Sequence, residues 1–144
     1  MATNRGEIKM ERKKKILVVD DDEIVLKSCQ RILESEGYEV TLTSNAKDAE
    51  EELKSGKFYD LLIMDVKMPE KDGLYLLDKI KKNWPIDQWP ILPVLVMSGY
   101  PTPETLEELF QRGAKKFIPK PFTPDEFIEA VKNTIEKAVK SKKS

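Results

Sequence analysis

Short, continuous apolar runs separated by amphipathic stretches constrain the fold of this chain most strongly. The clearest runs are Ile16-Leu17-Val18-Val19, Leu61-Leu62-Ile63-Met64 and Val94-Leu95-Val96-Met97. A strand that is apolar at every position is typical of a parallel sheet that helices cover on both faces. We therefore expect an α/β fold in which strands and helices alternate.

Two weaker segments complete the strand pattern. Residues 38–43 read as a strand, and a short strand is expected around residues 116–119. Five strands alternating with five helices predict an open parallel sheet with right-handed crossovers. In such sheets ligands bind at the carboxyl ends of the strands, where the strand order reverses.

Helical periodicity fills the intervals between the strands. The first stripe is Val25, Cys29, Ile32 and Leu33, and it ends near Gly37. This stripe places Cys29 in the core, where it is not expected to act as a nucleophile. The stripes of the later helices are Ala46, Ala49 and Leu53; Leu74, Leu77 and Ile80; Leu106, Leu109 and Phe110; and Phe127, Val131, Ile135, Ala138 and Val139.

Helix start signals support these assignments. Asp22 is expected to cap the first helix or to stabilise its dipole as a first-turn acid, and Asn45 can cap the second. Thr102-Pro103 opens another helix, which stops at Gly113. Thr123-Pro124-Asp125-Glu126 combines a capping threonine, a proline at the first helical position and a capping-box glutamate. Each cap predicts where a helix begins.

Length and charge limit the classes of function. A chain of 144 residues is of a size to form one domain. Its 25 basic and 26 acidic residues leave a net charge of −1, so we expect neither direct nucleic-acid binding nor attachment to a membrane surface. One cysteine and no apolar signal segment indicate a cytoplasmic protein. Without histidine, a phosphohistidine donor would have to be another molecule.

Polar residues gather where the apolar runs end. Asp20-Asp21-Asp22, Asp65, Ser98 and Lys120 follow the first, third, fourth and fifth strands. Taken alone, each of these residues could simply mark the end of a buried strand, where polar residues are common. Together they would place several carboxylates in one cleft. Carboxylates that close repel one another unless a proton, a lysine or a metal ion relieves them. An oxygen-only site suits Mg²⁺.

Such a set of side chains has the parts that phosphoryl transfer requires. The reaction needs alignment and charge neutralisation more than covalent help from the protein. Asp65 could supply the nucleophile, while Mg²⁺, Lys120 and the Ser98 hydroxyl could bind three phosphoryl oxygens.

Four motifs in this order resemble the receiver domain of two-component response regulators, the CheY-like superfamily. They are Ile16-Leu17-Val18-Val19-Asp20-Asp21-Asp22, Met64-Asp65-Val66-Lys67-Met68-Pro69-Glu70-Lys71-Asp72-Gly73, Met97-Ser98-Gly99-Tyr100 and Pro119-Lys120-Pro121-Phe122. The resemblance implies a doubly wound, flavodoxin-like (βα)5 fold with strand order 2-1-3-4-5. The resemblance covers residues 15–140. Residues 1–14 are polar and charged and are expected to form a flexible leader, and residues 141–144 a basic tail or the start of a linker.

The same resemblance implies roles for individual residues. Asp65 would be the phosphoacceptor and a metal ligand, Asp20 and Asp21 the acidic pair that holds Mg²⁺, and the backbone carbonyl of Lys67 a further ligand. Asp22 receives no metal role.

For the remaining positions the resemblance implies a switch. Ser98 would be the switch hydroxyl, where the family more often has threonine, and Phe117 the aromatic switch, where tyrosine is common. Lys120 would bind phosphate and precede a cis bond to Pro121.

The sequence leaves three functions open. The resemblance implies a phosphorylation-dependent signalling switch that receives phosphate from a histidine kinase or a histidine phosphotransfer protein and acts on a downstream effector, as a monomer or a phosphorylation-dependent dimer. A phosphatase or phosphotransferase of the haloacid-dehalogenase type, working through an aspartyl-phosphate, would need an aspartate two residues after the nucleophile, where this chain has Lys67. A docking receiver that takes no phosphate is disfavoured because the key side chains are present. We therefore expect no enzymatic activity beyond self-catalysed phosphorylation and dephosphorylation.

Other segments leave alternatives open. The residues outside the domain have room for no helix-turn-helix, ATPase or cyclase motif, so the chain is expected to be a stand-alone receiver or one domain of a longer regulator or hybrid kinase. Residues 83–93 contain three prolines and are expected to form an irregular loop. Its Trp84 and Trp89 would pack against the base of the loop or anchor a partner.

Overall fold

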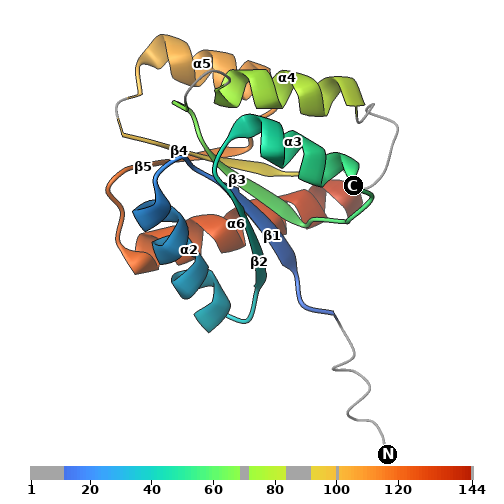
Figure 1. Ribbon diagram of the computed structural model, residues 1–144, viewed down its shortest axis with the longest axis vertical. Helices are drawn as coiled ribbons and strands as arrows, with labels where there is room; N and C mark the ends of the chain where they lie inside the picture. The colour runs from blue at the N-terminus through green and yellow to red at the C-terminus, as the bar shows by residue number, and fades with distance from the viewer. Residues whose placement is uncertain (1–11, 69–71, 84–91, 100, 144) are drawn as a thin grey trace, which may run out of the picture.

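The chain forms one five-stranded parallel sheet in the order β2-β1-β3-β4-β5, as Figure 1 shows. This computed structural model describes residues 12–68, 72–83, 92–99 and 101–143. The strands are β1 (Lys15–Val19), β2 (Glu39–Thr43), β3 (Leu61–Asp65), β4 (Val94–Ser98) and β5 (Lys116–Pro119). The helices, labelled as in Figure 1, are α2 (Glu23–Ser35), α3 (Ala46–Lys54), α4 (Gly73–Asn83), α5 (Pro103–Gln111) and α6 (Pro124–Lys143). The predicted fold class and strand order are confirmed.

The helices cover the two faces of the sheet separately. Helices α3, α4 and α5 lie on one face and α2 and α6 on the other (Figure 1). Along β1, Leu17 and Val19 pack toward the first group of helices, whereas Ile16 and Val18 pack toward the second. Because successive side chains of a strand point to opposite faces, this double burial explains why the strands read as continuous apolar runs.

Local capping chemistry begins the helices as predicted. The side chains of Asp22, Asn45 and Thr102 accept hydrogen bonds from backbone N–H groups in the first turns of α2, α3 and α5. Before α6 the capping box is reciprocal: the N–H of Thr123 donates to Glu126 Oε1 at 2.8 Å, and the N–H of Glu126 donates to Thr123 Oγ1 at 3.1 Å. These bonds satisfy N–H groups that lack partners within a helix.

Several apolar positions differ from the expected stripes: Leu74, Ile80 and Leu106 are only partly buried, as are Val25 and Ile32. In α2 the fully buried residues are Leu26, Cys29 and Leu33, and Val25 is only partly covered. In α5 the expected core residue Phe110 is 46% exposed, while Leu109 is buried. In these helices the neighbouring elements cover a narrower strip than the apolar residues occupy.

The basic residues that precede β1 contact the domain. The guanidinium of Arg12 donates to both carboxylate oxygens of Asp60, at 2.9 and 3.0 Å, and lies 4.6 Å from the ring centroid of Phe58. Asp60 also accepts a hydrogen bond of 2.7 Å from the backbone N–H of Lys15. Asp60 therefore binds both Arg12 and the first residue of β1, and so holds this segment against the domain.

Several expectations concern residues outside those described. They are the leader up to residue 11, the turn residues 69–71, loop residues 84–91 with both tryptophans, Tyr100, Ser144 and the side chains of residues 138–143. Across the described parts of the chain, no helix has the length and apolar character needed to cross a membrane.

Candidate functional site

Three carboxylates meet at the carboxyl edge of the central strands. Asp65 is the last residue of β3, and Asp20 and Asp21 follow β1 directly. Because β1 and β3 are paired neighbours, their ends lie side by side. One oxygen from each carboxylate lies within 4.8 Å of the others. The structure thus brings together the three aspartates for which the sequence predicts a metal-binding role.

A lysine joins this cluster from the far strand. Lys120 follows β5, and its ammonium lies 2.7 Å from Asp20 Oδ2 and 3.3 Å from Asp65 Oδ1. The backbone N–H of Lys120 donates to the carbonyl of Ser98 at 2.8 Å, which ties the loop to the end of β4. The peptide bond from Lys120 to Pro121 is cis, as predicted. The lysine therefore bridges two of the three carboxylates.

The two acidic neighbours have different surroundings. Asp20 is fully buried; its Oδ1 accepts a hydrogen bond of 2.9 Å from the N–H of Asp22, and its Oδ2 faces Lys120. Asp21 is exposed. Both oxygens of Asp20 thus already have protein donors, whereas Asp21 faces solvent.

Burial and the neighbouring charges alter proton affinity at the site. Burial, together with the negative charge of Asp20, raises the pKa of Asp65 to about 6, and Lys120 offsets only part of the rise. Burial alone would lower the pKa of Lys120, but its hydrogen bond to Asp20 and the charge of Asp65 raise it overall. Lys120 therefore relieves only part of the cost of burying Asp65 beside Asp20.

The other predicted site residues lie at the end of β4, just beyond β3 and within β5, and they differ in burial. Ser98 is the last residue of β4 and is 5% exposed. Lys67 lies two residues beyond Asp65 and is exposed. Phe117 lies in the edge strand β5, half-buried against the core on the side of α3, α4 and α5.

The start of α4 packs directly on the end of β3. The N–H of Gly73 donates to the carbonyl of Val66 at 2.8 Å. A Cβ at Gly73 would lie 3.1 Å from the carbonyl oxygen of Asp65 and 3.2 Å from the Cα of Val66. A side chain here would force these neighbours to shift by a few tenths of an ångström, so glycine suits this close approach. The turn that carries Lys67 is consequently held at both of its ends.

This donor set fits a small, oxygen-preferring cation. Carboxylate and backbone carbonyl oxygens are the ligands that Mg²⁺ favours, and it usually keeps several waters. Burial and the negative charge of Asp20 raise the pKa of Asp65, and a bound cation would oppose both effects. The exposed Asp21 leaves an approach from solvent.

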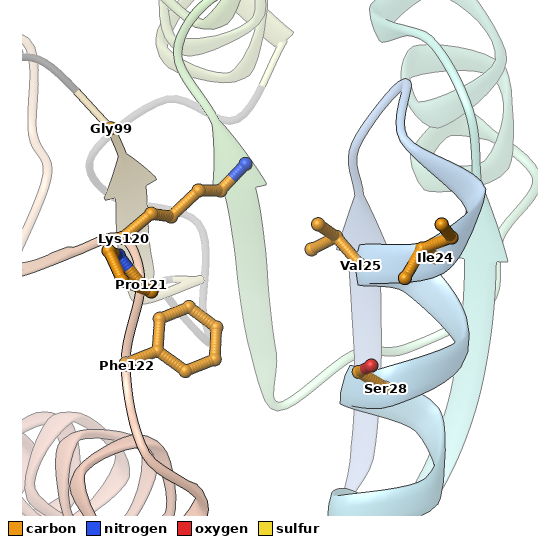
Figure 2. A pocket seen from close by; sticks show the side chains of 7 residues that line it. All are labelled: Ile24, Val25, Ser28, Gly99, Lys120, Pro121 and Phe122. Atoms are coloured by element: carbon orange, nitrogen blue, oxygen red, sulfur yellow. The ribbon is translucent and has the colours of Figure 1, made fainter.

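An apolar hollow of about 610 Å³ adjoins the cluster, and sequence reasoning missed it. Figure 2 shows Ile24, Val25 and Ser28 of α2 on one side, facing Lys120, Pro121 and Phe122 on the other. Ile24 is 77% exposed. The signal in the sequence is the run Ile24-Val25-Leu26, which has more apolar residues than a buried helix stripe needs.

Comparisons with known proteins agree on one family. A family model described as the response regulator receiver domain matches residues 16–132. The crystal structure of a CheY-like response regulator receiver domain protein from Methanospirillum hungatei JF-1 superimposes with a TM-score of 0.81 and is 32% identical, covering 90% of this chain and 99% of that one.

Two curated relatives are considerably longer than this chain. The transcriptional regulatory protein CrdR of Helicobacter pylori is 35% identical over 119 residues, which are 83% of this chain and 54% of CrdR. The DNA-binding transcriptional regulator NtrC of Escherichia coli is 35% identical over 120 residues, which are 83% of this chain and 24% of NtrC. The chain thus spans about half of the first relative and a quarter of the second.

Proposed function

Because the chain belongs to the response regulator receiver domain family, we propose that it acts as a phosphorylation-dependent switch with Asp65 as its phosphoacceptor. One observation carries this assignment: Asp65 lies beside the Lys120 ammonium and within a cluster of three carboxylates. An anionic nucleophile, a cation and a set of metal-binding oxygens are what phosphoryl transfer to a carboxylate requires. We assign this switch to residues 15–140.

The proposed reaction transfers one phosphoryl group to Asp65. A carboxylate oxygen of Asp65 attacks phosphorus while the bond between phosphorus and an imidazole nitrogen of the donor breaks, and that nitrogen keeps the electron pair. Lys120 neutralises charge on the phosphoryl oxygens, and the Ser98 hydroxyl donates a hydrogen bond to one of them. Only the ionised carboxylate is nucleophilic, and a cation bound beside Asp65 would favour that form by lowering its raised pKa.

We propose Mg²⁺ as the cofactor, held by Asp21, Asp65 and the backbone carbonyl of Lys67. Asp20, whose oxygens already have protein donors, would contribute mainly as a nearby negative charge. When bound, Mg²⁺ would neutralise the carboxylates and the charge that develops on the phosphoryl group. Lys67 can vary in side chain because only its backbone would be used.

The donor is proposed to be a phosphohistidine on another protein, a histidine kinase or a phosphotransfer protein. The chain itself contains no histidine. The apolar hollow offers the surface for docking, because Ile24 and Phe122 line it together with the active-site residue Lys120 (Figure 2). A donor helix that covers this hollow would bring its imidazole close to Asp65.

We propose that the output is read on the surface of α5, β5 and α6. Ser98 would move toward the phosphoryl group, and Phe117 in β5 would change its position in response. Phe117 supports this role because it is half-buried against the core and also lines a cavity of about 350 Å³ beside α6. The change would shift the population of two conformations that differ in effector binding or dimerisation.

The chain is not expected to hydrolyse external phosphate esters. A hydrolase that works through an aspartyl-phosphate needs a second acid or base two residues after its nucleophile, and that position is Lys67. We expect hydrolysis of a generic phosphomonoester to stay at the level of a buffer control.

The test is phosphorylation by a small donor. Incubation with acetyl phosphate and Mg²⁺ should add one phosphoryl mass to the intact protein, and Asp65→Asn should abolish the addition. Glu107→Gln, which removes a charge from an exposed position on α5, is the control and should be labelled like the wild type. Labelling of Asp65→Asn, or no labelling of the wild type, would contradict the proposal.

A further inference from the structure

A hydrogen bond joins helices α3 and α4 outside the cluster of carboxylates and Lys120. The Tyr75 hydroxyl donates to Glu50 Oε1 at 2.8 Å, and the Lys54 ammonium lies 3.0 Å from Glu50 Oε2. Lys79 lies 5.4 Å from the centroid of the Tyr75 ring. Glu50 is 8% exposed on the buried face of α3.

A buried carboxylate is costly unless it is paired and hydrogen-bonded. The hydrogen bond from Tyr75 and the nearby Lys54 ammonium hold the pKa of Glu50 below its ordinary value, although burial opposes them. Lys54 lies on the same helix as Glu50 and is exposed, so it could neutralise the Glu50 carboxylate without any contact to another helix. The bond to Tyr75 is different because it joins Glu50 to the first turn of another helix.

That first turn is in direct contact with the site. Tyr75 is the third residue of α4, and its backbone N–H donates to Asp72 Oδ1 at 3.2 Å. Gly73, the first residue of the helix, lies against the Asp65 carbonyl and donates to Val66. The first turn of α4 therefore contacts the backbone at Asp65 and Val66, directly before Lys67.

We propose that Tyr75 and Glu50 are positioning residues for the cation site. Their hydrogen bond holds the first turn of α4, Gly73 transmits that position to Val66, and Val66 orients the neighbouring carbonyl of Lys67. The inference rests on the proposed function, in which this carbonyl is a ligand of Mg²⁺. Residues that orient metal ligands without touching the metal commonly affect metal affinity.

The chain contains a matched control for this proposal. Tyr59 also donates to a glutamate of α3, at 2.5 Å from Glu52 Oε2. Tyr59 precedes β3 and lies toward the amino edge of the sheet, away from the carboxylate cluster. Tyr59→Phe and Tyr75→Phe thus each remove one hydroxyl that bonds to α3, but only Tyr75 belongs to α4.

The experiment measures Mg²⁺ affinity by calorimetric titration of the whole chain, together with the unfolding midpoint in urea without metal. Tyr75→Phe should weaken Mg²⁺ binding about 3- to 10-fold, less than the 10- to 100-fold typical of a residue bonded to the ligand itself. Tyr59→Phe should lower the urea midpoint but leave the affinity unchanged. Glu50→Gln keeps an acceptor for Tyr75 and should stay within about twofold of the wild type.

Glu50→Ala should match Tyr75→Phe, and the double variant should show no further loss of affinity because both changes break one connection. Unchanged affinity in Tyr75→Phe, or an equal loss in Tyr59→Phe, would overturn the inference while leaving the proposed function intact. A wild type that binds no Mg²⁺ would instead overturn the proposed function, and this inference with it.

Discussion

Replacing Asp65 with asparagine should stabilise the metal-free protein. The folded structure raises the pKa of Asp65 from 3.8 to about 6 because the carboxyl is buried and lies close to Asp20. Each pH unit of that rise corresponds to about 1.4 kcal/mol. At pH 8 the ionised carboxylate therefore costs the folded state about 3 kcal/mol, and the neutral amide introduced by Asp65→Asn removes the cost.

The sign of the pH dependence follows from the same values. A folded-state pKa above the unfolded one means that the folded protein binds the proton more tightly. The favourable contribution is complete below about pH 4 and is lost as the pH rises through about 6. The advantage of Asp65→Asn should therefore be largest at pH 8, fall between pH 6 and pH 4, and vanish below that range.

Urea unfolding in a metal chelator, at several pH values, measures this difference in free energy. Glu107→Gln removes an equivalent charge from an exposed site on α5 and should change stability by less than about 0.5 kcal/mol at every pH. Added Mg²⁺ should stabilise the wild type and narrow its gap to Asp65→Asn, because a ligand that binds only the folded state adds to stability. If Asp65→Asn is no more stable than the wild type at pH 8, the reasoning is refuted.

Three further perturbations follow from particular contacts. Gly73→Ala would place a Cβ 3.1 Å from the Asp65 carbonyl oxygen. It should lower the free energy of unfolding, measured in urea, by about 1–3 kcal/mol. An unchanged urea midpoint would contradict the close packing. Asp60→Asn breaks the contact with Arg12, which holds the pKa of the Asp60 carboxyl below its ordinary value although burial opposes it. The substitution should lower the free energy of unfolding by about 1–2 kcal/mol at pH 7, and this loss should shrink as the pH falls through that lowered pKa. A loss that stays constant with pH would exclude the pairing as its cause. Ile24→Asp places a charge in the apolar hollow and should slow phosphotransfer from a histidine kinase about tenfold or more. Labelling by acetyl phosphate should be unchanged. Equal slowing with both donors would count against docking of the kinase at the hollow.

Local signals predicted most of the fold. The strands read as apolar runs because both faces of the sheet are covered, and the capping residues Asp22, Asn45 and Thr102 act within one helical turn of their own position. Such short-range rules do not depend on the rest of the chain. Residue spacing predicted the alternation of elements, whereas the strand order came from the resemblance to a family.

Contacts between distant segments were not predictable in the same way. Phe110 has the spacing of a core residue, yet it is half-exposed because the neighbouring elements cover only a narrow strip of α5. The Arg12–Asp60 pair and the Tyr75–Glu50 bond join residues 48 and 25 positions apart. Their formation depends on how helices pack, which the period of apolar residues in one helix does not encode.

The candidate site lies between these two cases. Polar residues at strand ends indicated Asp20, Asp65 and Lys120, and the parallel sheet brings them together as expected. The hollow beside them requires α2 and the segment after β5 to face each other across the end of the sheet. Ile24 therefore became a candidate only through its exposure in the structure.

The most direct measurement locates the phosphoryl group after treatment with acetyl phosphate and Mg²⁺. Fragment masses of the labelled protein should place a single phosphoryl group on Asp65, and hydroxylamine should release it, because an acyl phosphate reacts with that nucleophile whereas a serine phosphate does not. Chelation of Mg²⁺ before the reaction should prevent the labelling. A hydroxylamine-stable phosphate on Ser98, or an unlabelled Asp65 under conditions in which Mg²⁺ binds, would contradict the assignment of Asp65 as the phosphoacceptor.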